Sequence, residues 1–418
     1  MGEPRFHFFL NYLSLNLLTF KRIDILKRKL ISPTAFVNTL GIKLRISVCI
    51  LTIGFSLVPM LVRSQQPMFQ TGVISAFSGT GFVTSAYPVI DRLKNGRLVC
   101  VFSCIADEKP SKMNIAFSIS DDNGLTWSKP QILFNHPGVE DADPSLLVDG
   151  DQILAFSTTV SVPGIDSTDI YMRSSKDGLT WGNEVHTKKP YRYISGKIHQ
   201  GHRLKDGTLI MGYAWDAWAE KGMPPRTEGE MDNRSGVLRS TDGGASWSAG
   251  SDIIYPEEIK RLSPGSAGGL CEPATVVLAD GRIMALVRTV GNELYKTYSS
   301  DNGLSWEYPR PSGLTAHNTP AALWKLDNSS DVLVAWNNSP VARDPLTVAL
   351  TTDGGKTWSP PRIVVKTGGP QASYPSVIQA KDGTMIVVWQ QNIIKGREVR
   401  IARFNRAWLL TRPANNNR

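Results

Sequence analysis

Five residues of this chain have charged or reactive side chains and stand next to short β-type segments: Asp107, Glu272, Arg288, Arg343 and Tyr374. Guanidinium groups hold anions through paired, charge-assisted hydrogen bonds. A carboxylate can take the proton of a phenol and so convert it into a nucleophile. Together these residue types indicate a site that binds an anionic group and activates a tyrosine, provided that the fold brings them together.

An X-Pro dipeptide opens an apolar segment at five places in the chain. The five are Tyr87-Pro88, Asp143-Pro144, Glu272-Pro273, Thr319-Pro320 and Tyr374-Pro375. Because they recur at the same point of a repeated unit, we expect the residues before the prolines to lie at one common end of the fold. The Asp280-Gly281 turn lies about midway between Glu272 and Arg288, so both should fall at that end and can approach each other.

The elements that must position these residues contain a repeated motif, here called the box: a hydroxyl residue, any residue, Asp, any residue, Gly, two more, then Trp. Strict copies occupy residues 120–127, 240–247, 299–306 and 351–358, and a degenerate copy occupies 174–181. The Asp accepts hydrogen bonds from its own turn, the Gly adopts positive φ, and the Trp covers the hairpin. Successive Trp residues are 52 to 66 residues apart, which predicts a repeated architecture in which they are packing residues.

Hairpins recur in register with the boxes. Their turns lie at 95–96, 149–150, 206–207, 280–281, 327–331 and 382–383. Asn-Gly or Asp-Gly between apolar β-rich runs is a strong hairpin signal. Each unit has room for four short antiparallel strands, so the sequence predicts an all-β fold, a six-bladed β-propeller. The last unit lacks a box, and we expect residues 72–77 to supply its outer strand and close the ring.

Up-and-down topology decides which ends of the blades carry the site. The first hairpin turn and the box share one end, here called the box end. The start of strand one and the loop after strand two share the other, here called the mouth, where the central channel opens. The residues expected at the mouth are Tyr87, Asp107, Asp143, Glu272, Arg288, Arg343 and Tyr374. Each alone could be structural, as a plain ion pair or a packing aromatic, but their convergence favours a functional site.

The third unit carries its own polar and aromatic residues. His199 and His202 precede its first strand, Trp215 and Trp218 follow its second, and an insert runs from 219 to 233. We predict that His202 and Trp215 line the mouth, where an aromatic ring suits stacking on a sugar. The alternative is that both histidines are structural and the insert is a solvated loop. Two histidines alone do not indicate a metal.

Charge is concentrated at the N-terminus. The 418-residue chain has a formal net charge of +9, but residues 1–63 hold nine Lys/Arg and two acidic residues, which accounts for +7. The remaining +2 gives no reason to expect nucleic acid as a partner. Lys43 and Arg45 precede an apolar run at 46–62 that is followed by Ser64, which predicts a signal peptide at about 43–64, cut before Gln65.

We therefore expect residues 1–64 to be a leader and residues 65–418 to be a secreted or periplasmic propeller. An uncleaved N-terminal membrane anchor is the alternative, and it would be the only contact with a membrane. We expect a monomer.

Three cysteines follow the leader: Cys100, Cys104 and Cys271. Cys100 and Cys104 are four residues apart on or just after one strand, a poor geometry for a disulfide, and an odd count is no disulfide framework. We expect buried thiols. The sequence has no CxxC, no HExxH and no phosphate-binding glycine loop, so no metal or cofactor is indicated.

On these motifs the chain resembles the sialidase (neuraminidase) superfamily, including its bacterial exo-sialidases, over about residues 70–408. The boxes are that family's hallmark, the Asp box or BNR repeat. Its site motifs are similar to three stretches here. They are Glu272-Pro273 with Arg288 downstream, Arg343 before Leu346-Thr347-Val348, and Ser373-Tyr374-Pro375-Ser376.

The resemblance implies roles for these residues. Tyr374 would be the nucleophile and Glu272 the base that polarises it. Asp107, with Glu108 beside it, would be the acid/base, and Arg288 and Arg343 would bind a sugar carboxylate. Sialidases use a Tyr nucleophile where most glycosidases use a carboxylate, which the sugar's own carboxylate would repel.

One position departs from the family. Its first arginine belongs to an Arg-Ile-Pro motif, whereas this chain has Ser85-Ala86-Tyr87-Pro88, with Ala86 in the arginine position. Arg92 lies farther down the strand and is a poor substitute. Losing one charge-assisted pair costs about 1.5–3 kcal/mol, or roughly ten- to a hundredfold in affinity. Ala86 therefore permits a different sugar.

Three functions are compatible with the sequence. The first is an exo-α-sialidase-like hydrolase that cleaves terminal sialic acid from glycoconjugates with retention. The second is a related glycosidase for another sugar, and the third is a non-catalytic carbohydrate- or protein-binding propeller. The presence of Glu272, Arg288, Arg343 and Tyr374 together argues against the third. The expected partner is a glycan.

Overall fold

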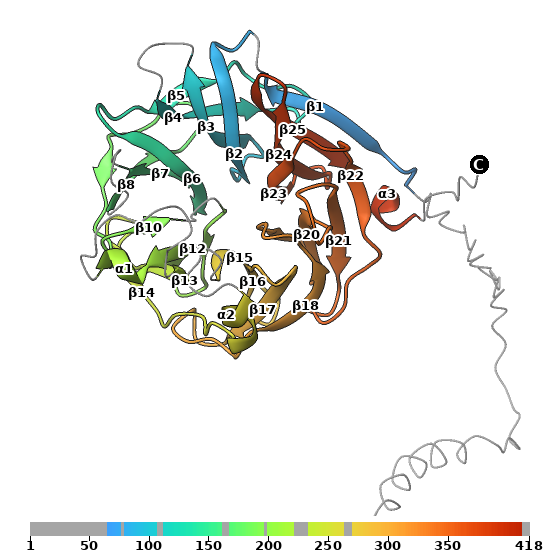
Figure 1. Ribbon diagram of the computed structural model, residues 1–418. Helices are drawn as coiled ribbons and strands as arrows, with labels where there is room; N and C mark the ends of the chain where they lie inside the picture. Colours follow the sequence, from blue (N-terminus) through green and yellow to red (C-terminus); the bar gives the residue numbers. More distant parts are fainter. Residues whose placement is uncertain are drawn as a thin grey trace, which may run out of the picture. The chain divides into compact units, whose positions relative to one another are not determined.

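The structure is a computed structural model that describes residues 65–76, 79–106, 112–160, 167–195, 199–220, 233–262 and 270–411. The leader predicted at 1–64 lies outside these residues. Their strands form six antiparallel sheets around a ring (Figure 1), so the predicted all-β, six-bladed propeller is confirmed. Within the same ranges, no helix has the length and apolarity needed to cross a membrane.

Each blade runs in chain order from the channel outward. Blade 1 comprises β2 (Phe82–Arg92), β3 (Leu98–Ala106), β4 (Met113–Ser120) and β5 (Gln131–Phe134). Blade 2 comprises β6 (Glu140–Asp149), β7 (Gln152–Val160), β8 (Thr168–Ser175) and β9 (Val185–His186). Blade 3 comprises β10 (Ile194–Ser195), β11 (His202–Arg203), β12 (Leu209–Asp216), β13 (Asn233–Ser240) and β14 (Ser248–Ala249). Its innermost position is shared by β10 and β11, both paired with β12.

The second half of the ring follows the same order. Blade 4 comprises β15 (Cys271–Val277), β16 (Ile283–Arg288), β17 (Glu293–Ser299) and β18 (Arg310–Thr315). Blade 5 comprises β19 (Ala322–Lys325), β20 (Val332–Asn337), β21 (Leu346–Thr351) and β22 (Arg362–Val365). Blade 6 comprises β23 (Ala372–Gln379), β24 (Met385–Ile393), β25 (Gly396–Phe404) and β1 (Phe69–Ser75). Three short helices are α1 (Ala217–Glu220), α2 (Glu257–Leu262) and α3 (Arg406–Leu410).

The two ends of the propeller close the ring on each other. Strand β1 pairs antiparallel with β25, from Phe69 opposite Phe404 to Val73 opposite Arg400. Figure 1 shows the blue first strand beside the red last strand. This confirms that the segment expected at 72–77 supplies the outer strand of blade 6, although the strand begins earlier, at Phe69.

The hydrophobic core lies between neighbouring blades. Leu346 and Leu350 of blade 5 join Val377 and Trp389 of blade 6 in one buried cluster. Equivalent clusters join blade 6 to blade 1, blade 1 to blade 2, blade 2 to blade 3, and blade 4 to blade 5. Because each sheet buries both faces against its neighbours, the mouth ends are held in fixed relation around the channel. The cysteines that follow the leader are buried and unpaired, as expected.

Each box ties its own turn together with the same hydrogen bonds. In the second strict copy, the Ser240 hydroxyl donates to Asp242 Oδ1 over 2.7 Å and accepts from Gly244 N over 2.9 Å. Ser246 N donates to Asp242 Oδ1 over 2.9 Å. Trp247 is 5% exposed and packs into the core between blades 2 and 3. The boxes are therefore packing devices, as the sequence predicts.

The degenerate box of blade 2 makes the same bonds one residue later than expected. Ser175, not Ser174, donates to Asp177 Oδ1 over 3.0 Å and accepts from Gly178 N over 2.8 Å. Thr180 N donates to Asp177 Oδ1 over 2.7 Å. The displaced Asp177 thus retains the box function because the hydroxyl partner shifts with it.

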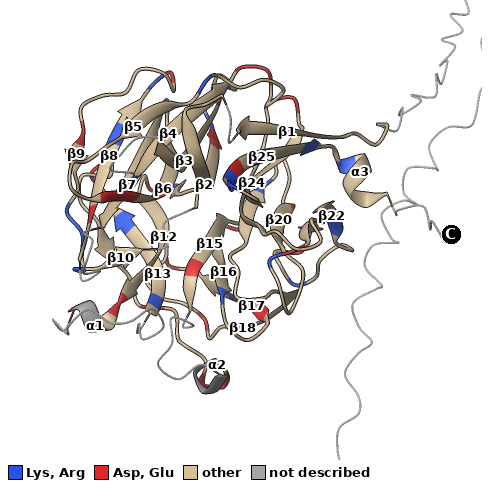
Figure 2. Ribbon diagram, turned by 45° about the horizontal axis from the view of Figure 1, so that its top comes forward, with Lys and Arg blue, Asp and Glu red and all other residues tan. Residues whose placement is uncertain are grey.

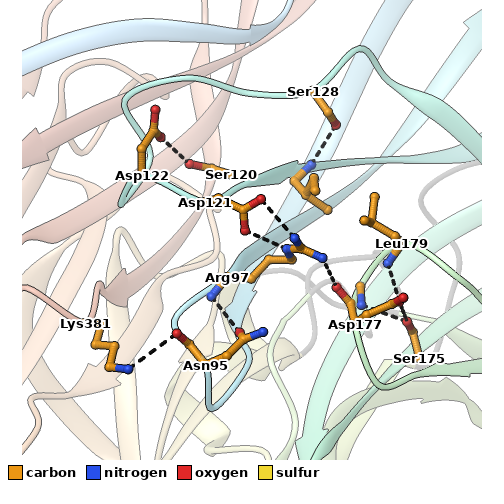
Figure 3. Close-up of polar contacts among 12 residues, drawn as sticks. Asn95, Arg97, Ser120, Asp121, Asp122, Ser128, Ser175, Asp177, Leu179 and Lys381 are labelled. Atoms are coloured by element: carbon orange, nitrogen blue, oxygen red, sulfur yellow. Dashed lines mark hydrogen bonds and ion pairs between the residues drawn. The ribbon is translucent and has the colours of Figure 1, made fainter.

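Side chains at the box end also join neighbouring blades. Arg97 of blade 1 pairs with Asp121 over 2.7 Å, and its Nη1 donates to the carbonyl of Asp177 in blade 2 over 2.6 Å. From blade 6, Lys381 Nζ donates to Asn95 O over 3.5 Å. Figure 3 shows these contacts converging on one turn. The box end is therefore a structural face.

The box carboxylates predict how stability responds to acid. Hydrogen bonds from Ser246 hold the pKa of Asp242 at about 2, and backbone hydrogen bonds from Thr180 and Leu179 do the same for Asp177. A pKa lowered on folding contributes stability above about pH 4, and this is lost as the pH falls toward 2. We expect the double variant D177N/D242N to be less stable at pH 7 and to lose less stability between pH 4 and 2. Melting temperature followed by circular dichroism tests this, and equal acid slopes for parent and variant would contradict it.

Candidate active site

Four of the five residues before the recurrent prolines have a left-handed backbone. The φ angle is 53° at Tyr87, 46° at Asp143, 47° at Glu272 and 53° at Tyr374. A non-glycine residue before proline rarely adopts this conformation, because its own Cβ and the following ring both oppose it. Each lies at a bulge where strand one breaks its register with strand two. Strain of this kind concentrates at functional sites, and the bulges re-aim four side chains at the mouth.

Glu272 and Arg288 form a half-buried ion pair at the mouth end of blade 4. Arg288 Nη1 lies 2.6 Å from Glu272 Oε2, and the two side chains are 14% and 13% exposed. Cys271 stands opposite Arg288 in the ladder between β15 and β16 (Figure 2), which brings the two together as the sequence predicts. Burial alone would lower the pKa of Arg288, but the charge of Glu272 outweighs it and the pKa rises. Both groups are therefore charged.

Asn318 holds the two arginines in place. Its side-chain Oδ1 accepts from Arg288 Nε over 2.7 Å, and its carbonyl accepts from Arg343 Nη2 over 2.8 Å. Its φ of 40° is one that Asn tolerates better than most residues. In blade 5 the positive φ thus falls one residue before Thr319, which is buried and donates to Asn337. Sequence reasoning missed Asn318, for which only its place two residues before Pro320 was a signal.

The loop that carries Arg343 is fastened to the strand that carries Tyr374. Ala372 N donates to Arg343 O over 3.1 Å. Asn337, the last residue of β20, donates from Nδ2 to Ala372 O over 2.7 Å. Because Ala372 opens β23 two residues before Tyr374, the guanidinium and the phenol are held in one rigid assembly.

Tyr374 lies among charged groups from three blades. The Arg343 Cζ is 5.1 Å from the centre of its ring, and the Tyr87 ring meets it edge to face at 4.7 Å. Burial, followed by the charge of Glu272, raises the pKa of Tyr374 to about 12, although Arg288 and Arg343 act in the opposite direction. The phenol is therefore protonated at neutral pH and needs a base before it can act as a nucleophile.

A third guanidinium stands on the other side of Tyr87. The Arg397 Cζ is 5.9 Å from the centre of the Tyr87 ring, and its Nη1 is 3.5 Å from the Tyr87 hydroxyl. Sequence reasoning missed Arg397 because it belongs to neither a box nor an X-Pro dipeptide. Ala86 is 2% exposed, and Arg92 is paired with Asp327 at the box end.

Two predicted site residues have other outcomes. Asp107, the expected acid/base, and its neighbour Glu108 lie outside the described residues. Asp143 has the left-handed backbone of the set and lies near Tyr193, whose pKa rises through burial and the negative charge of Asp143. Its role as a sugar ligand stays a prediction.

His202 does not line the mouth, so that prediction is wrong. Strand one of blade 3 begins at β10, and His202 in β11 stands opposite Ile210, close to the box end of β12. Its Nε2 donates to Thr275 O of blade 4 over 2.7 Å. His199 is closer to the site, because its Nε2 donates to Glu272 O over 3.2 Å, and burial lowers its pKa. Both histidines are structural.

Trp215 also differs from its prediction. It is 8% exposed and stacks on Tyr191, with ring centres 4.1 Å apart. Its Nε1 donates to Asp252 over 2.8 Å. The ring therefore packs within the core of blades 2 and 3 and does not offer a face to a sugar.

Two further features do not form part of this site. Among the described residues, no group of three or more His, Cys, Asp or Glu is arranged to hold a metal. A depression of about 420 Å³ lies at the box end, and it is lined in part by Arg97, Asp121 and Lys381. Arg97 and Asp121 neutralise each other there, whereas the mouth brings together cations from three blades.

Comparison with known sequences agrees with this architecture. Residues 96–387 match the family described as BNR repeat-like domain. A sialidase from Micromonospora viridifaciens is 23% identical over 390 residues, covering 82% of this chain and 55% of the relative. A sialidase from Bacteroides fragilis (strain YCH46) is 22% identical, covering 67% and 54%. A xyloglucanase from a Paenibacillus species is 27% identical, covering 59% and 24%. The chain thus spans about half the length of the two sialidases and a quarter of the xyloglucanase.

Solved structures share the fold. A Hadza microbial sialidase superposes with a TM-score of 0.66 at 16% identity, covering 80% of this chain and 68% of that one. A Dyadobacter fermentans protein of unknown function gives 0.62 at 18% identity, covering 81% and 99%. The family match spans most of the chain, and the six blades and their boxes have the same organisation. The chain belongs to the sialidase/BNR-repeat family of β-propeller proteins.

Proposed function

We propose that this chain is an exported, retaining glycoside hydrolase of the sialidase type that removes terminal sialic acid from glycoconjugates. The observation that carries the proposal is the grouping of Arg288, Arg343 and Glu272 around the protonated phenol of Tyr374. Two curated relatives are named sialidases, which supports it. Export rests on the apolar run at 46–62 and on Ser64.

The proposed reaction begins at Tyr374. Its oxygen attacks the anomeric carbon while its proton passes to Glu272, and the bond from that carbon to the leaving oxygen breaks. Asp107 gives the leaving oxygen a proton. Water then attacks the same carbon, Asp107 takes the water's proton, and Tyr374 leaves and recovers its proton from Glu272. Two displacements on one carbon retain its configuration.

The charges at the mouth favour this nucleophile over a carboxylate. The substrate's own carboxylate would repel a second one at the anomeric carbon, whereas a neutral phenol meets no such barrier. Arg288 and Arg343 carry two positive charges against the single negative charge of Glu272. The surplus positive charge attracts an anionic sugar and stabilises it through charge-assisted hydrogen bonds.

A related glycosidase for a neutral sugar is the second candidate. It is favoured by Ala86, which brings no charge from blade 1, and by the relative that is named a xyloglucanase. The same Tyr374 and Glu272 would then act on a sugar without a carboxylate.

Hydrolysis of paired fluorogenic substrates tests the proposal. We expect the purified full-length protein to release 4-methylumbelliferone from its α-sialoside at least about 10²-fold faster than from the β-glucoside, because unpaired arginines disfavour a neutral sugar. Preference for the glucoside or for a xyloglucan oligosaccharide would favour the second candidate. Glycan binding without hydrolysis of any substrate would indicate a binding propeller.

A further inference from the structure

We propose that Arg397 is a further substrate-binding residue, which brings a third positive charge to the acidic group of the sugar. The inference rests on the proposed function, because it concerns an acidic sugar in the same site. It assigns to blade 6 a cation that blade 1, with the buried Ala86 at its mouth, does not supply.

The hairpin between β24 and β25 places Arg397 at the mouth. Ile393 and Gly396 close its turn, and Arg397 stands opposite Asn392, one residue farther along. Loops that follow strand two lie at the mouth end of every blade, as those after β16 and β20 do. Arg397 therefore projects from the same blade as Tyr374 and from the same end.

Two aromatic rings connect Arg397 to the centre of the site. Its Cζ is 5.9 Å from the Tyr87 ring centre, which is 4.7 Å from that of Tyr374. The Arg343 Cζ is 5.1 Å from the Tyr374 ring centre. The strained backbone of Tyr87 and its amide bond to Gln390 Oε1, 3.2 Å long, fix the ring on which Arg397 rests. The series runs from one guanidinium across two phenol rings to another.

The pairing of the arginines indicates which of them can take an anion. Within the described ranges, Arg343 and Arg397 have no carboxylate within 4 Å, and Arg288 is paired with Glu272. Arg400, three residues along the same strand, has its own partner in Glu398 at 2.8 Å. Three guanidiniums against one carboxylate leave two surplus positive charges at the mouth. A half-buried surplus of this kind favours an anionic ligand over a neutral one.

Contact with Tyr87 could by itself account for the position of Arg397, since a guanidinium over an aromatic ring is a stable arrangement. A packing role predicts that loss of the charge affects acidic and neutral ligands alike. A binding role predicts a loss confined to the acidic ligand. The two are therefore distinguished by a matched pair of ligands.

The test uses isothermal titration calorimetry with the full-length protein, with N-acetylneuraminic acid and its methyl ester as probes. For R397Q we expect affinity for the acid to fall roughly ten- to a hundredfold, with little change for the ester. R397K keeps the charge and should retain most of the affinity for the acid, and R400Q should match the parent. With the fluorogenic sialoside, R397Q should raise KM and leave kcat nearly unchanged.

The outcomes separate the inference from the proposed function. If the parent binds the acid and cleaves the sialoside while R397Q binds the acid equally well, the inference is wrong and the proposed function stands. An equal loss for acid and ester would assign Arg397 to packing. If the parent neither prefers the acid nor cleaves the sialoside, both are overturned.

Discussion

Replacing Tyr374 by Phe should lower kcat for the sialoside by about 10³-fold or more, because it removes the oxygen that would form the bond to the anomeric carbon. The ring itself remains. Its contacts with Arg343 at 5.1 Å and with Tyr87 at 4.7 Å do not depend on the hydroxyl. We therefore expect Y374F to fold normally and to bind N-acetylneuraminic acid with nearly the affinity of the parent. Single-turnover kinetics and calorimetry measure the two effects separately.

Tyr87 offers a matched comparison, because its phenol lies in the same cluster but precedes a different proline. Its hydroxyl contacts only the Nη1 of Arg397 at hydrogen-bonding range among the described residues, at 3.5 Å. Loss of one such contact is worth about 1 kcal/mol, so Y87F should reduce kcat/KM by less than about tenfold. A similar loss of kcat in both variants, or full activity in Y374F, would show that Tyr374 is not the nucleophile.

The fold could be predicted from the sequence because its information is local and repeated. A box is completed by hydrogen bonds within eight residues, as from Ser240 to Ser246, so each copy specifies its own turn. The degenerate copy was recognised but misaligned, since the choice between Ser174 and Ser175 depends on the turn's geometry. Six such units then define the ring.

The ion pair could be predicted for a similar reason. Glu272 and Arg288 flank one hairpin turn, and the antiparallel ladder places Cys271 opposite Arg288. Two-stranded register follows from the sequence wherever a turn is recognised. The same topological argument placed Arg343 and Tyr374 at the mouth, where the structure brings them together.

The remaining residues depend on contacts between blades, which no local pattern encodes. His202 was misplaced because strand one of blade 3 is divided into β10 and β11. Trp215 lies on the right strand, but its ring packs on Tyr191. Asn318 and Arg397 were missed because their partners come from neighbouring blades. Sequence therefore predicts where strands end better than which way side chains point.

Replacing Glu272 by Gln should lower kcat at neutral pH by about 10²–10⁴-fold, which is the usual contribution of a general base. Gln retains the volume and an oxygen that can accept from Arg288 Nη1, so the geometry now held by the 2.6 Å contact is preserved. Loss of the negative charge leaves Arg288 uncompensated. We therefore expect E272Q to bind N-acetylneuraminic acid at least as tightly as the parent, so that turnover and affinity change in opposite directions.

The pH dependence of the same variant identifies the base. Without Glu272, the reaction needs the phenolate of Tyr374, whose pKa in the parent is about 12. Because Glu272 contributes to raising that pKa, the variant's phenol should ionise somewhat more easily, yet still above neutral pH. The rate of E272Q should rise about tenfold per pH unit between pH 6 and 9, whereas the parent should show no such rise. E293Q, which removes a carboxylate elsewhere in blade 4, serves as the control. A pH-independent rate in E272Q would mean that another group takes the proton, and Glu272 would then serve only to hold Arg288.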